Sequence, residues 1–283
     1  FVSFKNIINT SRVKIPFGVI QIGKAFRNEI VARQFIFRMR EFEQMEMQFF
    51  VRPGTEMDWY TYWKETRMKW HQSLGFGENN YRFHDHIKLA HYANAACDIE
   101  FNFPFGFKEL EGIHSRTDYD LNSHIEASGQ KLQYFDQASG TTYVPYVIEP
   151  SFGLTRAMMA FLVDAYREEE VRGEKRVLLA LNPELAPYKV AVLPLLKKRD
   201  DLVERAHAIR DGLAKEFPAV YDDTAAIGKL YRRQDEIGTP WCVTIDFDTI
   251  EKDGSFTLRE RDSMQQRRIT EAELFALLEE KVY

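Results

Sequence analysis

The stretch Phe26–Glu46, FRNEIVARQFIFRMREFEQME, contains two blocks rich in arginine, carboxylate and aromatic side chains. The first block ends at Glu29 and the second begins at Arg38, and the alternation within the second block predicts a strand. Two strands joined by a loop would place Arg27 and either Arg38 or Arg40 on one concave face. Guanidinium groups suit phosphate oxygens and an aromatic ring suits a base, so the stretch is compatible with nucleotide binding. The alternative is a solvated hairpin with cross-strand ion pairs.

Two further clusters carry groups that are able to bind ligands. Closely spaced carboxylates in Lys108–Gly112 and Arg116–Asp120 predict either an acidic surface turn or a site for a divalent cation such as magnesium. The stretch Ile148–Arg156, IEPSFGLTR, predicts a strand that runs into an apolar helix, and Gly153 permits close approach of the backbone. Arg156 adds a cation to a helix N-terminus that is already positive, so an anion should compensate there.

The patterning of the chain predicts two folded parts. Aromatic and β-branched residues between Phe26 and Phe107 indicate long strands of an antiparallel sheet. Strands accompanied by segregated helices are typical of an α+β domain. The helices expected in this part cover Asp58–Leu74, Asp85–Ala96 and Arg156–Glu170.

From about Leu185 the pattern becomes that of a small α/β domain. Pro183 and Pro187 mark the transition, so we predict domains at residues 1–182 and 183–283. Strands are expected at 189–196, at 241–247 and from 256, and helices at 202–213, at 225–237 and at the C-terminus, where Thr270 and Glu273 form a capping box.

Composition excludes several classes of protein. The 283 residues are 45% hydrophobic and 29% charged with a net charge of −5, which is ordinary for a globular protein. With 38 basic and 43 acidic residues, the chain is no polycation for binding nucleic acid through charge alone. No apolar run reaches the ~18 residues of a membrane span, so no membrane partner is expected. Two cysteines, Cys97 and Cys242, favour a reducing compartment and hence the cytoplasm.

Taken together, these clusters resemble the class II aminoacyl-tRNA synthetases. Phe26–Glu29 with Arg38 and Phe42 is similar to their motif 2, and Gly153–Arg156 is similar to their motif 3. Several longer strings are similar to the glycyl-tRNA synthetases of the dimeric bacterial and eukaryotic type: FRNEI, FIFRMREFEQMEMQFF, LAHYANAACDIEF, FKELEGI, RTDYDL and IEPSFGLTR. The chain from LAPYKVAVLPL onward resembles the anticodon-binding domain of the same family. The resemblance implies a class II core, an antiparallel sheet with flanking helices, followed by a small α/β anticodon-binding domain.

The resemblance also implies an activity. Glycine would be activated by ATP to glycyl-adenylate and passed to the 3′ end of glycine tRNA, with ATP and Mg²⁺ as cofactors and a homodimer as the full-length assembly. Arg27 and Arg156 would be catalytic: Arg27 contacts the α-phosphate and the glycine carboxylate, and Arg156 lies over an adenine that stacks on Phe42. The implied ATP contacts are Arg27, Asn28, Glu29, Phe37, Arg38, Arg40, Phe42, Glu109, Leu110, Gly153 and Arg156.

Glycine selection would depend on exclusion, because a pocket cannot grip a side chain that is missing but can clash with any that is present. The implied glycine contacts are Phe42, Glu43, Gln44, Glu46, Arg116, Glu149, Ser151 and Gly153, and the implied metal ligands are Glu109 and Glu149. Motif 1, which builds the dimer interface of this family, should precede residue 1, so we expect the chain to be a fragment of a longer protein.

Two other functions remain open at this point. A non-catalytic, synthetase-like nucleic-acid-binding protein, of the kind that serves as a polymerase accessory subunit, would not need the complete set Arg27, Glu29, Phe42 and Arg156. A class II synthetase for threonine, proline or histidine is disfavoured by the strings EPSFGLTR and FEQME. Three histidines that are candidate metal ligands are expected instead to flank a helix: His84, His86 and His91. Three tryptophans that are candidates for base stacking are expected instead to pack a helix: Trp59, Trp63 and Trp70.

Overall fold

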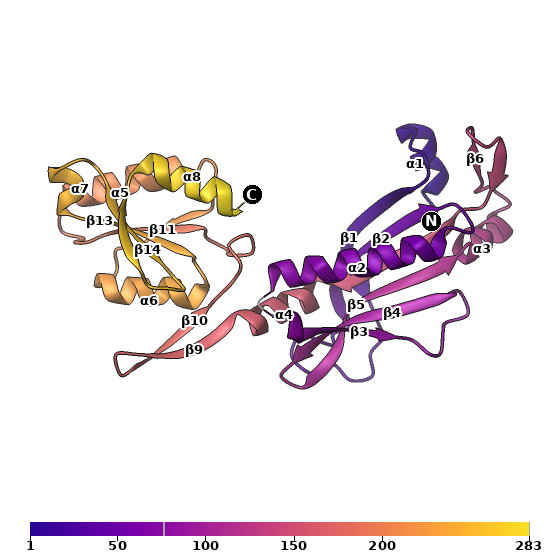
Figure 1. Cartoon of the computed structure of the whole chain (residues 1–283), viewed down its shortest axis with the longest axis horizontal. Coiled ribbons are helices and arrows are strands. Elements are labelled where there is room, and N and C mark those ends of the chain that lie inside the picture. Colours follow the sequence, from indigo (N-terminus) through magenta and orange to yellow (C-terminus); the bar gives the residue numbers. More distant parts are fainter. Residues whose placement is uncertain (76, 283) are drawn as a thin grey trace. The chain divides into compact units, whose positions relative to one another are not determined.

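The computed structural model describes residues 1–75 and 77–282 and divides into two compact units. The first comprises Phe1–Ser73 with Gly77–Ala160, and the second contains the chain from Phe161 onward. Figure 1 shows a mixed arrangement of helices and sheet within each unit. Within the described residues, no helix is both long enough and apolar enough to cross a bilayer.

A six-stranded antiparallel sheet forms the first unit, which confirms the predicted sheet. Its outer strand β1 pairs with β2 from Phe17 opposite Phe50 to Phe26 opposite Glu41. In spatial order the strands are β1 (Phe17–Phe26), β2 (Glu41–Val51), β8 (Tyr146–Gly153), β5 (Gly106–Thr117), β4 (Ala95–Phe103) and β3 (Tyr81–Asp85).

Helix α2 (Glu56–Leu74) packs its aromatic side chains on this sheet. Trp59 and Trp63 lie 4.9 and 5.2 Å from the ring of Phe49, and Trp70 lies 5.8 Å from Phe152. The tryptophans therefore pack the helix, as expected. The other elements of this part are α1 (Phe4–Ser11), α2 (Glu56–Leu74), the 3-10 turn η1 (Glu78–Asn80), α3 (Tyr119–Ser128), β6 (Tyr134–Asp136), β7 (Thr141–Tyr143) and α4 (Leu154–Ala165).

The helix predicted at Asp85–Ala96 is wrong. β3 ends at Asp85, residues 86–94 are irregular, and β4 begins at Ala95. The alanines of this stretch favour a helix, but pairing of β4 with both β3 and β5 overrides that local preference. His84 and His86 accordingly flank no helix; they contact Glu100 and Asp98 of β4 at 3.1 and 2.9 Å.

The helix predicted at Arg156–Glu170 begins two residues earlier and ends sooner. α4 stops at Ala165, and β9 (Tyr166–Val171) pairs with β10 (Glu174–Leu179) in a hairpin. The two turn residues, Arg172 and Gly173, both have positive φ angles, as the favoured two-residue hairpin turn requires. The hairpin belongs to the second compact unit.

The second unit contains the α/β arrangement that the pattern predicts. β11 lies between the parallel strands β12 and β13, and β14 and β15 continue antiparallel from β13. The bounds are β11 (Val190–Pro194), α5 (Asp200–Leu213), β12 (Ala219–Tyr221), α6 (Ile227–Ile237), β13 (Trp241–Ile245), α7 (Phe247–Glu251), β14 (Phe256–Glu260), β15 (Gln266–Ile269) and α8 (Glu271–Val282).

The helix signals read from this part of the sequence are confirmed, whereas the strand predicted at 241–247 ends at Ile245 and Phe247 begins α7. The residues at helical spacing in α5 are all fully buried: Leu202, Ala206, Ile209 and Leu213. The capping box forms before α8, because Thr270 N donates to Glu273 Oε2 at 2.8 Å and Glu273 N donates to Thr270 Oγ1 at 3.3 Å. Cys97 and Cys242 are free thiols and both are buried.

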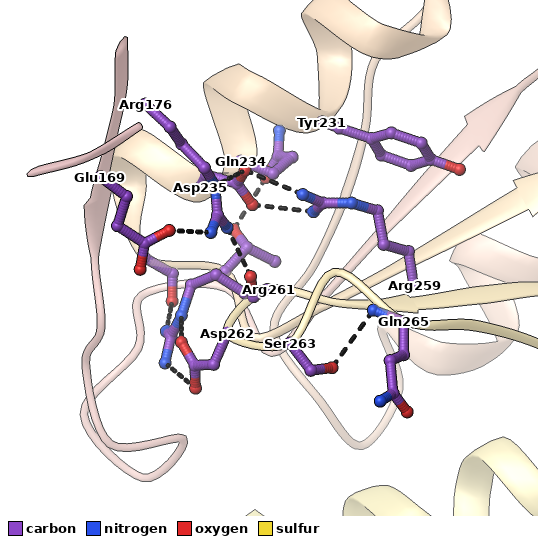
Figure 2. Close-up of polar contacts among 12 residues, drawn as sticks. Glu169, Arg176, Tyr231, Gln234, Asp235, Arg259, Arg261, Asp262, Ser263 and Gln265 are labelled. Carbon is purple, nitrogen blue, oxygen red and sulfur yellow. Dashed lines mark hydrogen bonds and ion pairs between the residues drawn. The ribbon is translucent and has the colours of Figure 1, made fainter. Parts of the chain in front are cut away.

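Buried charges attach the β9–β10 hairpin to the second unit (Figure 2). Asp235 of α6 is fully buried and accepts from Arg176 Nε of β10 at 3.0 Å and from Arg259 Nη1 of β14 at 2.8 Å. Arg261 donates to the carbonyl oxygens of Gly238 and Leu181 at 2.7 and 2.8 Å. Because buried charges must be paired, these contacts explain why the hairpin belongs with this unit.

Candidate functional site

Arg27, Arg38 and Arg40 lie in the loop between β1 and β2, not on the strands as predicted. Strand pairing ends at Phe26 opposite Glu41, and Arg27 N then donates to the carbonyl oxygen of Arg40 at 2.9 Å. The side chain of Arg40 turns back along the loop, where its Nε donates to the carbonyl oxygen of Glu29 at 2.9 Å. Arg40 therefore holds the loop in shape and does not line the cavity beside it.

One cavity of about 1140 Å³ lies on a single face of the first unit's sheet. Alternate residues of β2 face it, since neighbouring side chains of a strand point to opposite sides. The predicted residues that line it are Arg27, Glu29, Phe37, Arg38, Phe42, Gln44, Glu46, Glu109, Arg116, Glu149, Ser151, Gly153 and Arg156.

Four predicted contacts lie outside this lining: Asn28, Arg40, Glu43 and Leu110. Glu43 is on the opposite side of β2 from Phe42 and Gln44, as strand alternation requires. Leu110 is buried in the core, because β5 contains a bulge at which Ile99 pairs with Glu111 while Glu100 pairs with Glu109. The extra residue turns Leu110 inward and leaves Glu109 on the cavity side.

Cations and rings gather at one end of the cavity. The guanidinium carbon of Arg27 lies 5.4 Å from the ring centroid of Phe42, and that of Arg156 lies 4.3 Å from the ring of Phe37. Arg156 also donates to the carbonyl oxygens of Glu109 and Phe37 at 2.9 and 3.3 Å. Burial lowers the pKa of Arg156 and the nearby cations Arg27 and Arg38 lower it further, whereas Glu109 opposes them. This excess of positive charge favours an anion.

Glu29 is fixed beside this end. Arg38 Nη1 donates to both of its carboxylate oxygens, at 3.1 and 3.0 Å, and the pair is partly buried. Each oxygen retains a second lone pair that is able to accept a hydrogen bond from a ligand.

The other end of the cavity holds a short polar network across β2 and β8. Glu46 is directly opposite Ser151 in the register, and Ser151 Oγ donates to Glu46 Oε1 at 3.1 Å. Gln44 Nε2 contacts Ser151 Oγ at 2.7 Å and Glu46 Oε1 at 2.8 Å. The Glu46 carboxylate therefore lies at the cavity surface, where hydrogen bonds from Ser151 and Gln44 hold it in place.

A second carboxylate, Glu149, faces the same end. It accepts from Arg116 Nη1 at 3.0 Å and from Gln48 Nε2 at 2.8 Å, and Asp120 holds Arg116 at 2.8 and 2.9 Å. Burial raises the pKa of Glu149, and Arg116 opposes that rise. This end of the cavity therefore offers acceptors suited to a small cation such as an ammonium group.

Sequence reasoning missed two residues of β5 that line this end, Gly112 and His114. Gly112 is paired with Ser151 on one side and Asp98 on the other, and a Cβ added there would lie 2.9 Å from His114 Cε1. Burial lowers the pKa of His114, and His86 and Arg116 lower it further. Alternation backward from Arg116 along the strand would have found both residues.

The register separates the two predicted metal ligands. Glu149 is opposite His114, and Glu109 lies five positions from His114 along β5, beyond the bulge. The side chain of Glu109 is 51% exposed and lies 3.3 Å from Arg156, whereas Glu149 is held by Arg116 and Gln48. Among the described residues, no three His, Cys, Asp or Glu side chains form a metal-ligand cluster.

Comparison with known proteins places both parts of the chain. Residues 3–166 match the family described as "tRNA synthetase class II core domain (G, H, P, S and T)", and residues 189–281 match the "Anticodon binding domain". Over its whole length the chain is 56% identical to a "Glycine--tRNA ligase" of Caldanaerobacter subterraneus subsp. tengcongensis, 55% to one of Geobacillus kaustophilus and 54% to one of Treponema denticola. It spans 61%, 61% and 64% of the lengths of these relatives. A class II core match over more than half of the chain, together with a sheet that gathers the motif 2 and motif 3 residues around one cavity, shows that the chain belongs to the class II tRNA synthetase family.

Proposed function

We propose that the protein to which this chain belongs is a glycine–tRNA ligase, which activates glycine with ATP and transfers it to the 3′ end of glycine tRNA. One observation carries the proposal: a cationic and aromatic end with Arg27, Phe42 and Arg156 and an acceptor-rich end with Glu46 and Glu149 belong to a single cavity. The glycine–tRNA ligase names of the relatives described above support the choice of amino acid.

The first step needs no protein nucleophile. A glycine carboxylate oxygen forms a bond to the α-phosphorus of ATP, the bond from that phosphorus to the bridging oxygen breaks, and pyrophosphate leaves. In the second step a ribose hydroxyl of the tRNA attacks the glycyl carbonyl carbon, loses its proton, and AMP leaves. Catalysis then depends on position and charge, which Arg27 supplies by lying where the two negatively charged reactants meet.

The adenosine and phosphate positions follow from the cationic end. Phe42 provides a ring for the base, with Glu29 beside it as an acceptor for the adenine amino group. Arg156 is stacked on Phe37, and the other face of its guanidinium would meet the nucleotide. Arg38 lies on the same side and supplies a second cation toward the phosphates.

Glycine is selected at the acceptor end. Its ammonium group would be accepted by Glu46 and Glu149, whose carboxylates are fixed by Ser151 and Arg116. The Gln44–Ser151–Glu46 contacts fill the space beside that position, so a larger amino acid would clash with them.

A magnesium ion would be held by Glu109. Its half-exposed carboxylate lies at the cationic end, and Mg²⁺ is commonly held by one or two carboxylates together with substrate phosphates. When bound, the ion would neutralise phosphate charge. Glu149 does not fit the same ion, because it lies at the other end and is already paired with Arg116.

The partners of the full-length protein are part of the same proposal. Residues 189–281 would contact the tRNA anticodon, as the name of the matched family indicates. A homodimer is compatible with the outer strand β1, whose Ile20 and Ile22 are 68% and 59% exposed. Two free, buried thiols fit a reducing compartment such as the cytoplasm.

The test is pyrophosphate–ATP exchange with glycine, alanine and serine in parallel, on this chain and on an N-terminally extended protein. We expect exchange that glycine alone stimulates. Exchange stimulated equally by alanine would contradict glycine as the substrate. Binding of long duplex DNA without any pyrophosphate–ATP exchange would instead support a non-catalytic, synthetase-like nucleic-acid-binding protein.

A further inference from the structure

A fully buried carboxylate lies directly behind the glycine end of the cavity. Glu111 of β5 is 0% exposed and points away from the cavity, toward α2. Its oxygens accept from Arg67 Nε at 2.7 Å and Arg67 Nη2 at 3.0 Å, and Oε2 lies 2.6 Å from His71 Nε2. Burial alone would raise the pKa of Glu111, but the hydrogen bonds from His71 and Arg67 outweigh burial and lower it.

The same side chains enclose Phe152 of β8. The guanidinium carbon of Arg67 lies 5.2 Å from the ring of Phe152 and 4.2 Å from that of Trp70. The ring of His71 packs against Phe152 at 5.9 Å. Arg67 and His71 of α2 thus contact both β5 and β8, the two strands that provide Gly112 and Ser151.

The strand register connects this network to the cavity. Glu111 is paired with Phe152, and the next pair along the two strands is Gly112 with Ser151. Neighbouring residues of a strand face opposite sides, so the ionic pair behind the sheet lies one residue from the Gly112–Ser151 pair in front. Any change in the spacing of β5 and β8 at Glu111 is therefore transmitted directly to the cavity.

We propose that the Arg67–Glu111–His71 network positions the wall that excludes larger amino acids, so that Glu111 is a specificity-determining positioning residue. The inference rests on the proposed glycine–tRNA ligase function. A pocket that selects by exclusion depends on where its backbone walls lie, because glycine offers no side chain to bind. A two-pronged arginine–carboxylate contact suits this task, because its two parallel hydrogen bonds are directional.

Two variants test the proposal by pyrophosphate–ATP exchange: Glu111→Gln removes the buried charge, and Arg67→Lys keeps the charge but loses the two-pronged contact. We expect the glycine KM to rise about tenfold, because small misplacements of a binding site cost large factors in rate. The ratio of alanine to glycine activation should rise as well, while the ATP KM stays unchanged.

Asp235→Asn provides a matched control. Asp235 is another fully buried carboxylate held by arginines, and it lies in the second unit (Figure 2). This variant should lower the thermal midpoint without changing the glycine KM or the alanine ratio. If Glu111→Gln and Arg67→Lys behave in the same way, the network only stabilises the fold and the proposal is wrong.

Hydrogen exchange separates failure of this proposal from failure of the proposed function. If the unmodified protein shows no glycine-dependent pyrophosphate–ATP exchange, the proposed function fails. The positioning role is then decided by the backbone amides of residues 111–113 and of Ser151 and Phe152. Faster amide exchange there in Glu111→Gln, but not in Asp235→Asn, supports positioning, and unchanged protection overturns it.

Discussion

Ser151 and Glu46 are directly opposite each other on β8 and β2, and Ser151 Oγ donates to Glu46 Oε1 at 3.1 Å. The hydroxyl therefore fixes one oxygen of the carboxylate that would accept the glycine ammonium group. The contact requires strand pairing between residues more than one hundred positions apart in the chain. Glycine recognition thus depends on the register of the sheet.

Ser151→Ala should impair the use of glycine far more than the use of ATP. Losing a hydrogen bond to a charged group costs about 1.5–3 kcal/mol, so the glycine KM should rise by roughly ten- to one hundredfold. The measurement is steady-state exchange at varied glycine and varied ATP. Ser139→Ala, on an exposed turn, is the matched control. Equal increases in both Michaelis constants would count against the assignment.

Arg27→Gln should nearly abolish activation of glycine. Removing one preorganised group that stabilises developing charge costs about 10²–10³-fold in rate. Arg27 is exposed, so the thermal midpoint should not change. Arg33→Gln removes a cation from the same loop but outside the cavity lining, and should retain activity. Similar rates for the two variants would show that only the overall charge of the loop matters.

The glycine KM should rise on acidification, at a higher pH than a free glutamate would cause. Burial raises the pKa of Glu149, so on acidification this carboxyl is protonated at a higher pH than a free glutamate and then loses its attraction for an ammonium group. The raised pKa affects folding stability in the opposite direction. Glu149 contributes stability below its unfolded-state pKa, and this contribution is lost as the pH rises through its folded-state pKa. Comparison with Glu149→Gln checks the assignment, because that variant should have a flatter pH profile of KM.

Ile209→Ala should destabilise the second unit by about 2–5 kcal/mol, because it leaves a cavity in a closely packed core. Ile237→Ala, at a residue that is 41% exposed, should change stability much less. Urea unfolding followed by circular dichroism measures both. Pyrophosphate–ATP exchange should survive in each variant under native conditions, since the cavity lies in the first unit. Equal losses of stability would contradict the proposed core position.

The sequence predicted the second unit well because its signals are local. The spacing of the buried face of α5 and the Thr270–Glu273 cap are readable within single elements. The first unit depends on pairing over long distances. The alanines near Ala95 favour a helix, but β4 has strands on both sides, and only the assembled sheet provides those partners.

In the candidate site, too, local motifs are readable from the sequence, whereas positions set by long-range strand pairing are not. Most of the residues that motif resemblance predicted line the cavity, including Arg27, Phe42 and Arg156. The resemblance also included Glu43, which strand alternation turns away, and Leu110, which a bulge in β5 turns inward. The sequence marks Glu111 as one of several closely spaced carboxylates but does not reveal its role, because its partner Arg67 lies 44 residues away on a helix behind the sheet.

Binding of stable adenylate analogues tests the central claim, that one cavity holds both the nucleotide and glycine. Calorimetry would compare a glycyl-sulfamoyl adenosine with its alanyl counterpart on the unmodified protein, Arg27→Gln and Ser151→Ala. We expect the glycyl compound to bind at least about tenfold more tightly than the alanyl compound, and each variant to weaken it. Equal affinity for the two compounds, or binding that neither variant changes, would contradict the account.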